Sequence, residues 1–210
     1  AGSDANSGKT KAELSSDGTH YSITGQKMWI TNGGFANLFT VFAKIEDDEN
    51  LTAFLVEAES EGISLNPEEK KMGIKGSSTR QVFFNNVKVP VENMLSERGN
   101  GFKIALNILN IGRIKLGAAV MGGAKGGIDE SVRYSLEREQ FGRSIAKYGA
   151  IRYKLAEQVI QTYVVESATY RAGQNIDDAI KGLMEDGMDK AQATLQGIEL
   201  FAPECAVIKV

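Results

Sequence analysis

The sequence has very little of the residue types that build disulfide frameworks and metal sites. Among its 210 residues there is one cysteine, Cys205, and one histidine, His20. A single cysteine excludes an internal disulfide, and one thiol with one imidazole cannot form the nitrogen and sulfur ligand sets typical of zinc. A Ser-His-Asp or Cys-His arrangement would have to use His20. We therefore expect no metal site and no nucleophilic triad.

Excess charge of one sign and long hydrophobic runs are also lacking. The 24 basic and 27 acidic residues give a net charge of -3, which leaves no basic footprint for nucleic acid. No apolar run approaches the roughly 20 residues of a membrane span, so no transmembrane segment is expected. With 42% hydrophobic and only 3 proline residues, the composition is that of a folded soluble protein.

Both ends of the sequence look internal to a longer protein. The chain opens on Ala1 without an initiator methionine, a signal peptide or an arginine-rich transit pattern. Near the other end, Pro203 suits the first position of a helix for which only residues 204–210 remain. We expect this chain to be a fragment.

Period-two hydrophobic patterns predict strands before Pro90. Residues 21–24 and 27–31, separated by Gly25, predict a hairpin, and Asn32-Gly33-Gly34 predicts a tight turn with left-handed conformers. Further strands are predicted at residues 38–45, 51–58, 81–84 and 87–89. Short strands at this density predict a small antiparallel barrel or sandwich.

Helical periodicity replaces the strand pattern from about residue 100. Apolar residues from Phe102 to Val120 recur at three- and four-residue steps, a second stripe covers residues 151–167, and a weaker one covers 188–201. A break of the first helix near Gly126-Gly127 stays open, because interior glycines cost up to ~1 kcal/mol each. We expect an α+β chain with a β-barrel domain at residues 1–95 and part of a helical bundle at 96–210.

Three segments stand out by their residue types. Trp29 and Thr31 share one face of a strand, where they could stack on and hydrogen-bond a flat heteroaromatic ligand, although a core tryptophan is the commoner meaning of such spacing. The segment 138–143 predicts a helix end with a glycine C-cap at Gly142. Glu68-Glu69-Lys70-Lys71 is expected to be an exposed loop.

Five segments taken together carry a resemblance. They are Ala-Gly-Ser-Asp at 1–4, Gly-Gln-Lys-Met-Trp-Ile-Thr-Asn-Gly-Gly at 25–34, Lys-Met-Gly-Ile-Lys-Gly-Ser-Ser-Thr-Arg at 71–80, Val-Phe-Phe-Asn-Asn-Val-Lys-Val-Pro at 82–90 and Arg-Glu-Gln-Phe-Gly at 138–142. In this order and spacing the chain resembles the acyl-CoA dehydrogenase family. Residues 71–113 are most similar to its long-chain and very-long-chain branch.

The resemblance implies a middle β-barrel followed by part of a four-helix bundle, with flavin adenine dinucleotide (FAD) between them. It implies α,β-dehydrogenation of an acyl-CoA to a trans-2-enoyl-CoA, with electrons passed to an electron-transferring flavoprotein. The expected assembly is a homodimer or homotetramer, located in the bacterial cytoplasm or, in a eukaryote, the mitochondrial matrix. An acyl-CoA oxidase, or a fragment that only binds and oligomerises, are the alternatives.

The resemblance also implies roles for individual residues. It places Gly2, Ser3, Trp29, Ile30 and Thr31 at the flavin of the same subunit. It places Arg138, Gln140 and Phe141 at the flavin of a neighbouring subunit, and Ser3, Ser77, Asn110 and Arg113 at the acyl-CoA.

No catalytic base is expected within the chain. The family uses a glutamate, which in most branches would lie beyond Val210. In other branches it would lie on the helix around Asn110, but Gly112 occupies that position. The acids Glu130, Glu137 and Glu139 are expected on a solvated helix face or in ion pairs with nearby arginines.

Overall fold

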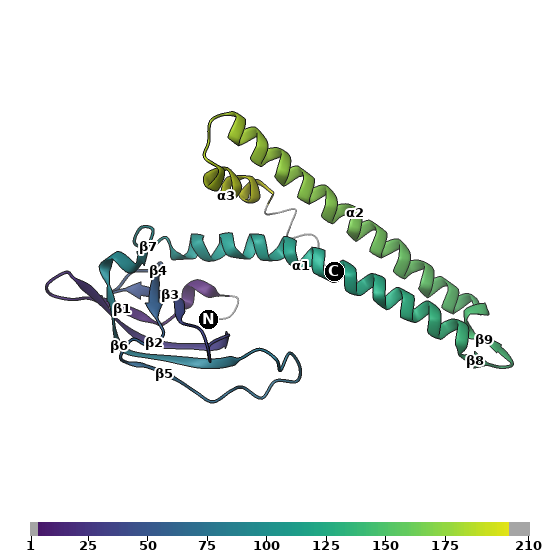
Figure 1. Cartoon of the computed structure of the whole chain (residues 1–210), viewed down its shortest axis with the longest axis horizontal. Helices are drawn as coiled ribbons and strands as arrows, with labels where there is room; N and C mark the ends of the chain where they lie inside the picture. Colours follow the sequence, from purple (N-terminus) through teal and green to yellow (C-terminus); the bar gives the residue numbers. More distant parts are fainter. Residues whose placement is uncertain (1–3, 202–210) are drawn as a thin grey trace. The chain divides into compact units, whose positions relative to one another are not determined.

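The computed structural model describes residues 4–201, which divide into two compact units, Ala1–Ala105 and Leu106–Val210. The first is a sheet unit and the second a helical unit (Figure 1). The expected α+β fold class, strands followed by long helices, is confirmed.

The sheet unit contains one seven-stranded sheet with the strand order β5-β6-β2-β1-β3-β4-β7. Every adjacent pair is antiparallel except β1 and β3, which pair in parallel, so the sheet is mixed. Its strands are β1 (Lys11–Leu14), β2 (His20–Thr31), β3 (Leu38–Ile45), β4 (Thr52–Glu57), β5 (Ile63–Leu65), β6 (Thr79–Pro90) and β7 (Met94–Leu95), with short 3-10 helices η1 (Ala5–Ser7) and η2 (Val91–Asn93).

The core of this unit follows from the alternation of its strands. Along β3, Phe39, Val41 and Ala43 point inward while their neighbours are more exposed, as period-two patterning requires. Phe54 of β4 is fully buried and meets Tyr21 edge to face, with ring centroids 5.1 Å apart. This packing fixes the sheet whose outer edges carry the candidate site.

The predicted hairpin around Gly25 is wrong, because β2 runs continuously through that residue. β6 pairs with β2 on both sides of it, with Ile23 opposite Val87 and Gly25 opposite Phe84. A bulge accommodates the glycine, and a Cβ added there would lie 2.8 Å from the Thr10 Cα, so the close approach of two backbones requires glycine. The turn after β2 is also made differently: Asn32, not the two glycines that follow it, has the left-handed φ of 65°.

The helical unit contains α1 (Gly101–Glu137), most of which belongs to this unit, α2 (Gly149–Glu185) and α3 (Lys190–Leu200). α1 continues without a break through Gly126 and Gly127. α2 and α3 pack against each other, and the Asp189 side chain caps α3 by accepting the Ala191 and Gln192 amides. Several large apolar side chains on α1 and α2 remain exposed, including Leu116, Ile160 and Tyr163.

The expected glycine C-cap after the first helix is wrong. α1 ends at Glu137, and a hairpin of β8 (Glu139–Gln140) and β9 (Arg143–Ser144) follows before η3 (Ile145–Lys147). Phe141 and Gly142 both have positive φ, 53° and 76°, the pattern of a two-residue type I′ turn. The tight turn between two paired strands, not a helix cap, uses the glycine.

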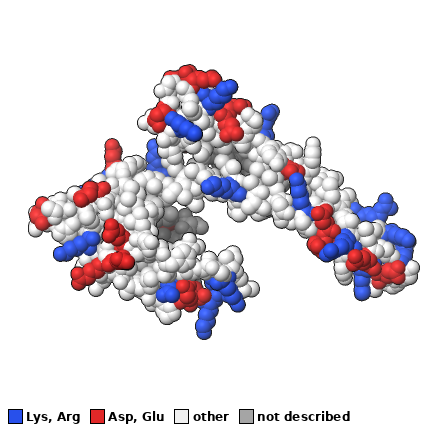
Figure 2. Space-filling view, in the orientation of Figure 1, with Lys and Arg blue, Asp and Glu red and all other residues white. Residues whose placement is uncertain are grey.

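Acidic and basic side chains are interspersed on the surface shown in Figure 2. Among the described helices, α1 alone has the length and composition that could cross a membrane, with a window of mean hydropathy 1.4. The apolar stretches of the sequence did not predict such a helix. A single such helix is weak evidence, because core helices of soluble proteins share the property, and it identifies no clear transmembrane segment.

Candidate ligand-binding site on the sheet unit

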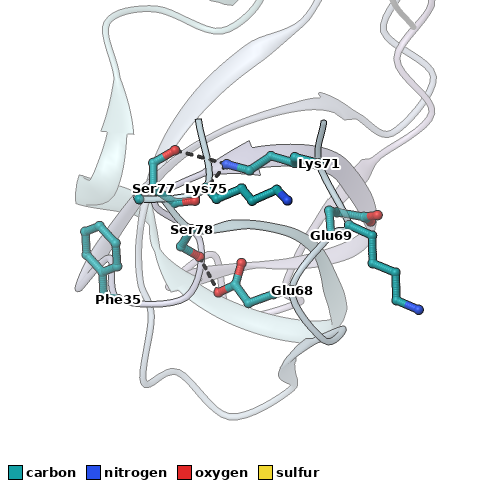
Figure 3. Close-up of a pocket in the computed structure, with 9 residues that line it drawn as sticks. Phe35, Glu68, Glu69, Lys71, Lys75, Ser77 and Ser78 are labelled. Atoms are coloured by element: carbon teal, nitrogen blue, oxygen red, sulfur yellow. Dashed lines mark hydrogen bonds between the residues drawn. The ribbon is translucent and has the colours of Figure 1, made fainter. Parts of the chain in front are cut away.

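A cavity of about 730 Å³ lies beside the loop that joins β5 to β6 (Figure 3). Backbone bonds from Asn66 to Gln81 and from Glu69 to Thr79 hold the start of this loop along β6. The cavity is lined by Phe35, Glu68, Glu69, Lys70, Lys71, Lys75, Gly76, Ser77 and Ser78. Lysines, hydroxyl groups and a glycine around one cavity suit an anionic ligand such as a phosphate.

Lys71 organises the wall of this cavity. Its half-buried ammonium donates to the Ser77 carbonyl at 2.7 Å, the Ser77 hydroxyl at 3.1 Å and the Thr79 hydroxyl at 3.0 Å. All three protons of the ammonium are therefore used to hold the segment around Ser77. Lys75 makes no such internal bonds among the described residues and lies beside Lys71 in Figure 3.

Glu68 fixes the opposite side of the same segment. Its carboxylate accepts the Ser78 hydroxyl at 2.7 Å, the Thr79 amide at 2.9 Å and the Arg80 guanidinium at 2.8 Å. The bond from Arg80, followed by those from Ser78 and Thr79, lowers the pKa of Glu68 to about 2. Residues 68–71 form a loop, as expected, with Glu68 and Lys70 exposed; the Glu68 and Lys71 side chains also hold this loop in place, which the sequence did not predict.

A second cavity of about 630 Å³ lies along the second half of β2. The Trp29 side chain is 62% exposed, so it is not the core aromatic that its spacing alone would favour. Its φ of 59° is unusual for a bulky residue and coincides with a register shift between Lys27 and Ile30. The lining residues are Ser7, Gly8, Lys9, Thr10, Gly25, Gln26, Lys27, Met28, Trp29 and Ile30.

Lys27 brings a titratable amine to this second cavity. Its Nζ donates to the Phe42 carbonyl on β3 at 2.7 Å. Burial lowers the pKa of Lys27 to about 8, because the low-dielectric surroundings penalise the charged form.

The predicted ligand residues fall on both units. On the sheet unit, Ser77 lines the first cavity, Trp29 and Ile30 line the second, and Thr31 is the exposed last residue of β2. Ile30 also packs partly on the core. Gly2 and Ser3 lie outside the described residues.

The other predicted ligand residues belong to the helical unit. Arg113 donates to the Asn110 side chain at 2.7 Å one turn earlier on α1. Arg138 lies between α1 and the hairpin, Gln140 ends β8, and Phe141 at the turn is 94% exposed. Glu130 pairs with Arg133, as expected for a surface acid.

Sequence reasoning missed Glu68, Lys71 and Lys27 as parts of the site. For Lys71, the hydroxyl residues six and eight positions later give a signal that is visible only once the loop is known to fold back on itself. For Lys27, the period-two spacing from the inward-facing Tyr21 and Ile23 was available in the sequence, but a lysine at such a position has many other meanings.

Two family models match the chain in tandem. "Acyl-CoA dehydrogenase, middle domain" matches residues 1–87, and "Acyl-CoA dehydrogenase, C-terminal domain" matches residues 99–202. The first match covers the strands of the sheet unit as far as Val87 in β6, and the second covers α1, the hairpin, α2 and α3.

Individual relatives agree with these matches. A probable acyl-CoA dehydrogenase of Bacillus subtilis (strain 168) is 42% identical over 210 residues, covering 100% of this chain and 35% of the relative. The human mitochondrial very long-chain specific acyl-CoA dehydrogenase is 47% identical over 185 residues. The match covers 84% of this chain and 28% of the human protein. This chain thus spans about a third of the length of these relatives.

A solved structure extends the likeness to three dimensions. An acyl-CoA dehydrogenase from Bacillus anthracis, crystallised in complex with FAD, superimposes with a TM-score of 0.89 at 45% sequence identity. The superposition covers 100% of this chain and 36% of that one.

Proposed function

Because this chain belongs to the acyl-CoA dehydrogenase family, we propose that it serves the FAD-dependent α,β-dehydrogenation of a long-chain acyl-CoA in fatty-acid β-oxidation. The product is a trans-2-enoyl-CoA. The single observation that carries the proposal is the position of Trp29, whose indole is kept out of the core at the edge of a cavity by a strained backbone. Strain of this kind concentrates at functional sites.

The residues around the second cavity fit a flavin. An exposed indole provides a flat apolar surface, and the Thr31 hydroxyl makes no hydrogen bond to another residue in the described range, so it is free to donate. Gly25 lets β2 lie so close to Thr10 that a Cβ at this position would collide with the Thr10 backbone. In this proposal Trp29, Ile30 and Thr31, together with Gly2 and Ser3, hold the flavin of their own subunit.

FAD, when bound, supplies the acceptor for the hydride that leaves the β carbon. The contribution of this chain is binding and orientation. Trp29 covers the ring and keeps water from it, and Thr31 offers a donor toward the nitrogen that receives the hydride. Donors placed where negative charge develops lower the barrier more than they stabilise the ground state.

The first cavity is proposed to hold the coenzyme A arm of the substrate. Its exposed Lys70 and Lys75 attract phosphate, while Lys71 holds Ser77 in place for a direct contact. Asn110 and Arg113 on α1 are proposed as further contacts to the same substrate, since Arg113 still has donors left after its bond to Asn110.

The hairpin after α1 is proposed to reach the flavin of a neighbouring subunit through Arg138, Gln140 and Phe141. A phenylalanine that is 94% exposed at the tip of a tight turn, with a positive φ, is placed for contact with something outside its own unit. The active assembly is then a dimer or a tetramer, and an electron-transferring flavoprotein takes the electrons. The bacterial and mitochondrial relatives make the cytoplasm or the mitochondrial matrix the proposed location.

No catalytic base is assigned among the described residues. Glu130 is an exposed partner of Arg133 on α1, which is an ordinary surface ion pair. We propose that a glutamate outside these 210 residues removes the α proton.

The experiment follows the flavin itself. Titrating the complete protein into FAD should change the flavin fluorescence in a saturable way. An anaerobic long-chain acyl-CoA should then bleach the flavin absorbance. Thr31→Val keeps the side-chain shape and removes the hydroxyl, so we expect bleaching at least 10-fold slower, with a smaller loss of FAD affinity.

Two results would contradict the proposal. A protein that cannot be loaded with flavin would refute the cofactor, and a Thr31→Val variant that bleaches at the wild-type rate would refute the role of Thr31. Comparing dioxygen with an artificial electron acceptor distinguishes a dehydrogenase from an oxidase.

A further inference from the structure

Ser78 joins two parts of the sheet unit that are far apart in the sequence. Its carbonyl accepts the Asn32 amide at 2.9 Å, and its hydroxyl accepts the Gly34 amide at 2.9 Å. Asn32 directly follows Thr31, the last residue of β2, and Ser78 directly follows Ser77 of the first cavity. Adjacent backbone positions therefore connect the end of β2 with the wall of that cavity.

Glu68 determines how Ser78 is held. The Ser78 hydroxyl donates to Glu68, as Figure 3 shows. Its lone pairs are thereby turned toward the Gly34 amide. Arg80 and the Thr79 amide bind the same carboxylate, which fixes it from two further directions. There is no room for a side chain at Gly34, because an added Cβ would lie 2.5 Å from the Ser78 hydroxyl and 2.8 Å from a Glu68 oxygen.

We propose that Glu68 is a positioning residue that couples the coenzyme A cavity to the flavin-facing end of β2 through Ser78. Occupation of the cavity at Ser77 restrains Ser78, and Ser78 restrains the turn that follows Thr31. This inference rests on the proposed function, because it assigns the two ligands to those two places. It goes beyond that function by making the affinities for the two ligands depend on each other.

The expected coupling is reciprocal. If bound coenzyme A strengthens FAD binding by some factor, bound FAD must strengthen coenzyme A binding by the same factor. Glu68→Gln removes the charge and replaces one acceptor oxygen by an NH2 group. Ser78 and Arg80 donate to one carboxylate oxygen and the Thr79 amide donates to the other. Whichever way the Gln amide turns, its NH2 group faces at least one of these donors, so at least one bond that holds the segment from Ser78 to Arg80 is lost and the remaining ones lose their charge assistance.

The experiment measures dissociation constants and does not depend on turnover. In the complete protein, Kd for coenzyme A is measured by calorimetry with and without saturating FAD, and Kd for FAD is measured by flavin fluorescence with and without coenzyme A. For each ligand, the ratio of Kd without the other ligand to Kd with it measures the coupling. We expect this ratio to be about 5 or more in the wild type, as is common for coupled sites. In Glu68→Gln and in Ser78→Ala, it should fall to within 2-fold of unity, while each ligand alone still binds.

Asp48→Asn is the matched control. Asp48 forms a comparable charge-assisted pair with Arg98, at 2.7 and 2.8 Å, on the same unit but away from both cavities. It should keep the wild-type ratio, even if its melting temperature falls as much as that of Glu68→Gln. Ser78→Ala keeps the ion pair between Glu68 and Arg80, so this variant still tests the coupling if Glu68→Gln fails to fold.

The possible outcomes separate this inference from the proposed function. A wild-type protein that binds neither FAD nor coenzyme A would overturn the function. A wild-type protein that binds both with a ratio of unity would overturn the coupling alone. So would variants at Glu68 or Ser78 that keep the wild-type ratio.

Discussion

The two units bury their apolar side chains to very different extents. In the sheet unit, residues such as Ile23, Val41 and Phe54 are almost inaccessible to solvent. In the helical unit the buried apolar residues are mainly small, as at Ala172 and Ala193, although Ile176 is also buried, while Tyr163 is 69% exposed. The sheet unit thus contains both sides of its own core, whereas the helical unit has long helices with uncovered apolar faces.

This difference shows which forces shape each unit. A strand has no stability without its neighbours, so the sheet forms only where distant segments pair, as β2 does with β6. A helix satisfies its backbone locally, so α1 and α2 keep their form even where their apolar faces lack a partner within the unit. Exposed apolar area of this extent favours association with another surface.

The largest expected effect comes from Phe54→Ala. The side chain is 0% exposed and packs edge to face on Tyr21, so its removal leaves a cavity that the sheet cannot fill. We expect a loss of about 3–5 kcal/mol in the free energy of unfolding. Urea unfolding followed by circular dichroism measures it.

Tyr163→Ala provides the comparison in the helical unit. Because Tyr163 is exposed, its removal should change the free energy of unfolding by less than about 0.5 kcal/mol at low protein concentration. A loss as large as that of Phe54→Ala would show that Tyr163 is buried in the protein in solution, and would remove the contrast between the units.

Local pattern was enough to predict some elements and insufficient for others. The alternation of β3 predicts residues 38–45, and the structure has the same bounds, since each residue there simply faces in or out. β6 was expected as two strands around Asn85-Asn86. Asn86 does have a positive φ of 51°, but its bonds to the Thr24 side chain on β2 hold both strands together across the irregularity. Pairing between distant segments overrides a local turn signal.

The site was predictable only where its residues are unusual in kind. Trp29 and Thr31 stand out in the sequence, and the structure places them at the exposed end of β2. Glu68 and Lys71 are ordinary charged residues, and their importance comes from hydrogen bonds to Ser77, Ser78 and Thr79 that exist only in the folded loop. Such contacts cannot be predicted from the amino-acid composition.

Lys27→Met is expected to change the free energy of unfolding by an intermediate amount that depends on pH. The folded state releases the Lys27 proton at a pKa of about 8, against 10.5 for an ordinary lysine, so between these values the unfolded chain binds more protons. Stability attributable to Lys27 therefore rises with pH across this window. The full shift would correspond to an upper bound of about 3 kcal/mol, reduced by partial exposure to water.

Thermal unfolding between pH 7 and 10 tests this assignment. The wild-type melting temperature should rise relative to that of Lys27→Met as the pH increases. Lys88→Met removes an exposed amine from β6 and serves as the control, with the same pH profile as the wild type. Parallel profiles for the wild type and Lys27→Met would show that the amine is solvated.

Two glycine-to-alanine substitutions should separate the two units by the sign of their effect on stability. An added Cβ at Gly122 of α1 meets no atom within 4 Å, whereas at Gly25 it meets the Thr10 backbone at 2.8 Å. Gly122→Ala should therefore stabilise the helix by up to ~1 kcal/mol, because alanine loses less conformational freedom. Gly25→Ala should destabilise the sheet unit by about 1–3 kcal/mol through overpacking.

Measuring both self-association and stability of Gly122→Ala tests whether another helix packs on this face of α1. If nothing packs on this face of α1, the variant melts at a slightly higher temperature and sediments as the wild type does. If another helix approaches closely at the glycine, the added methyl group separates the two surfaces and weakens association, even while the isolated helix gains stability. A fall in association constant with a gain in helix content would thus show that the glycines of α1 serve close helix packing, and that the contrast between the units ends once the protein assembles.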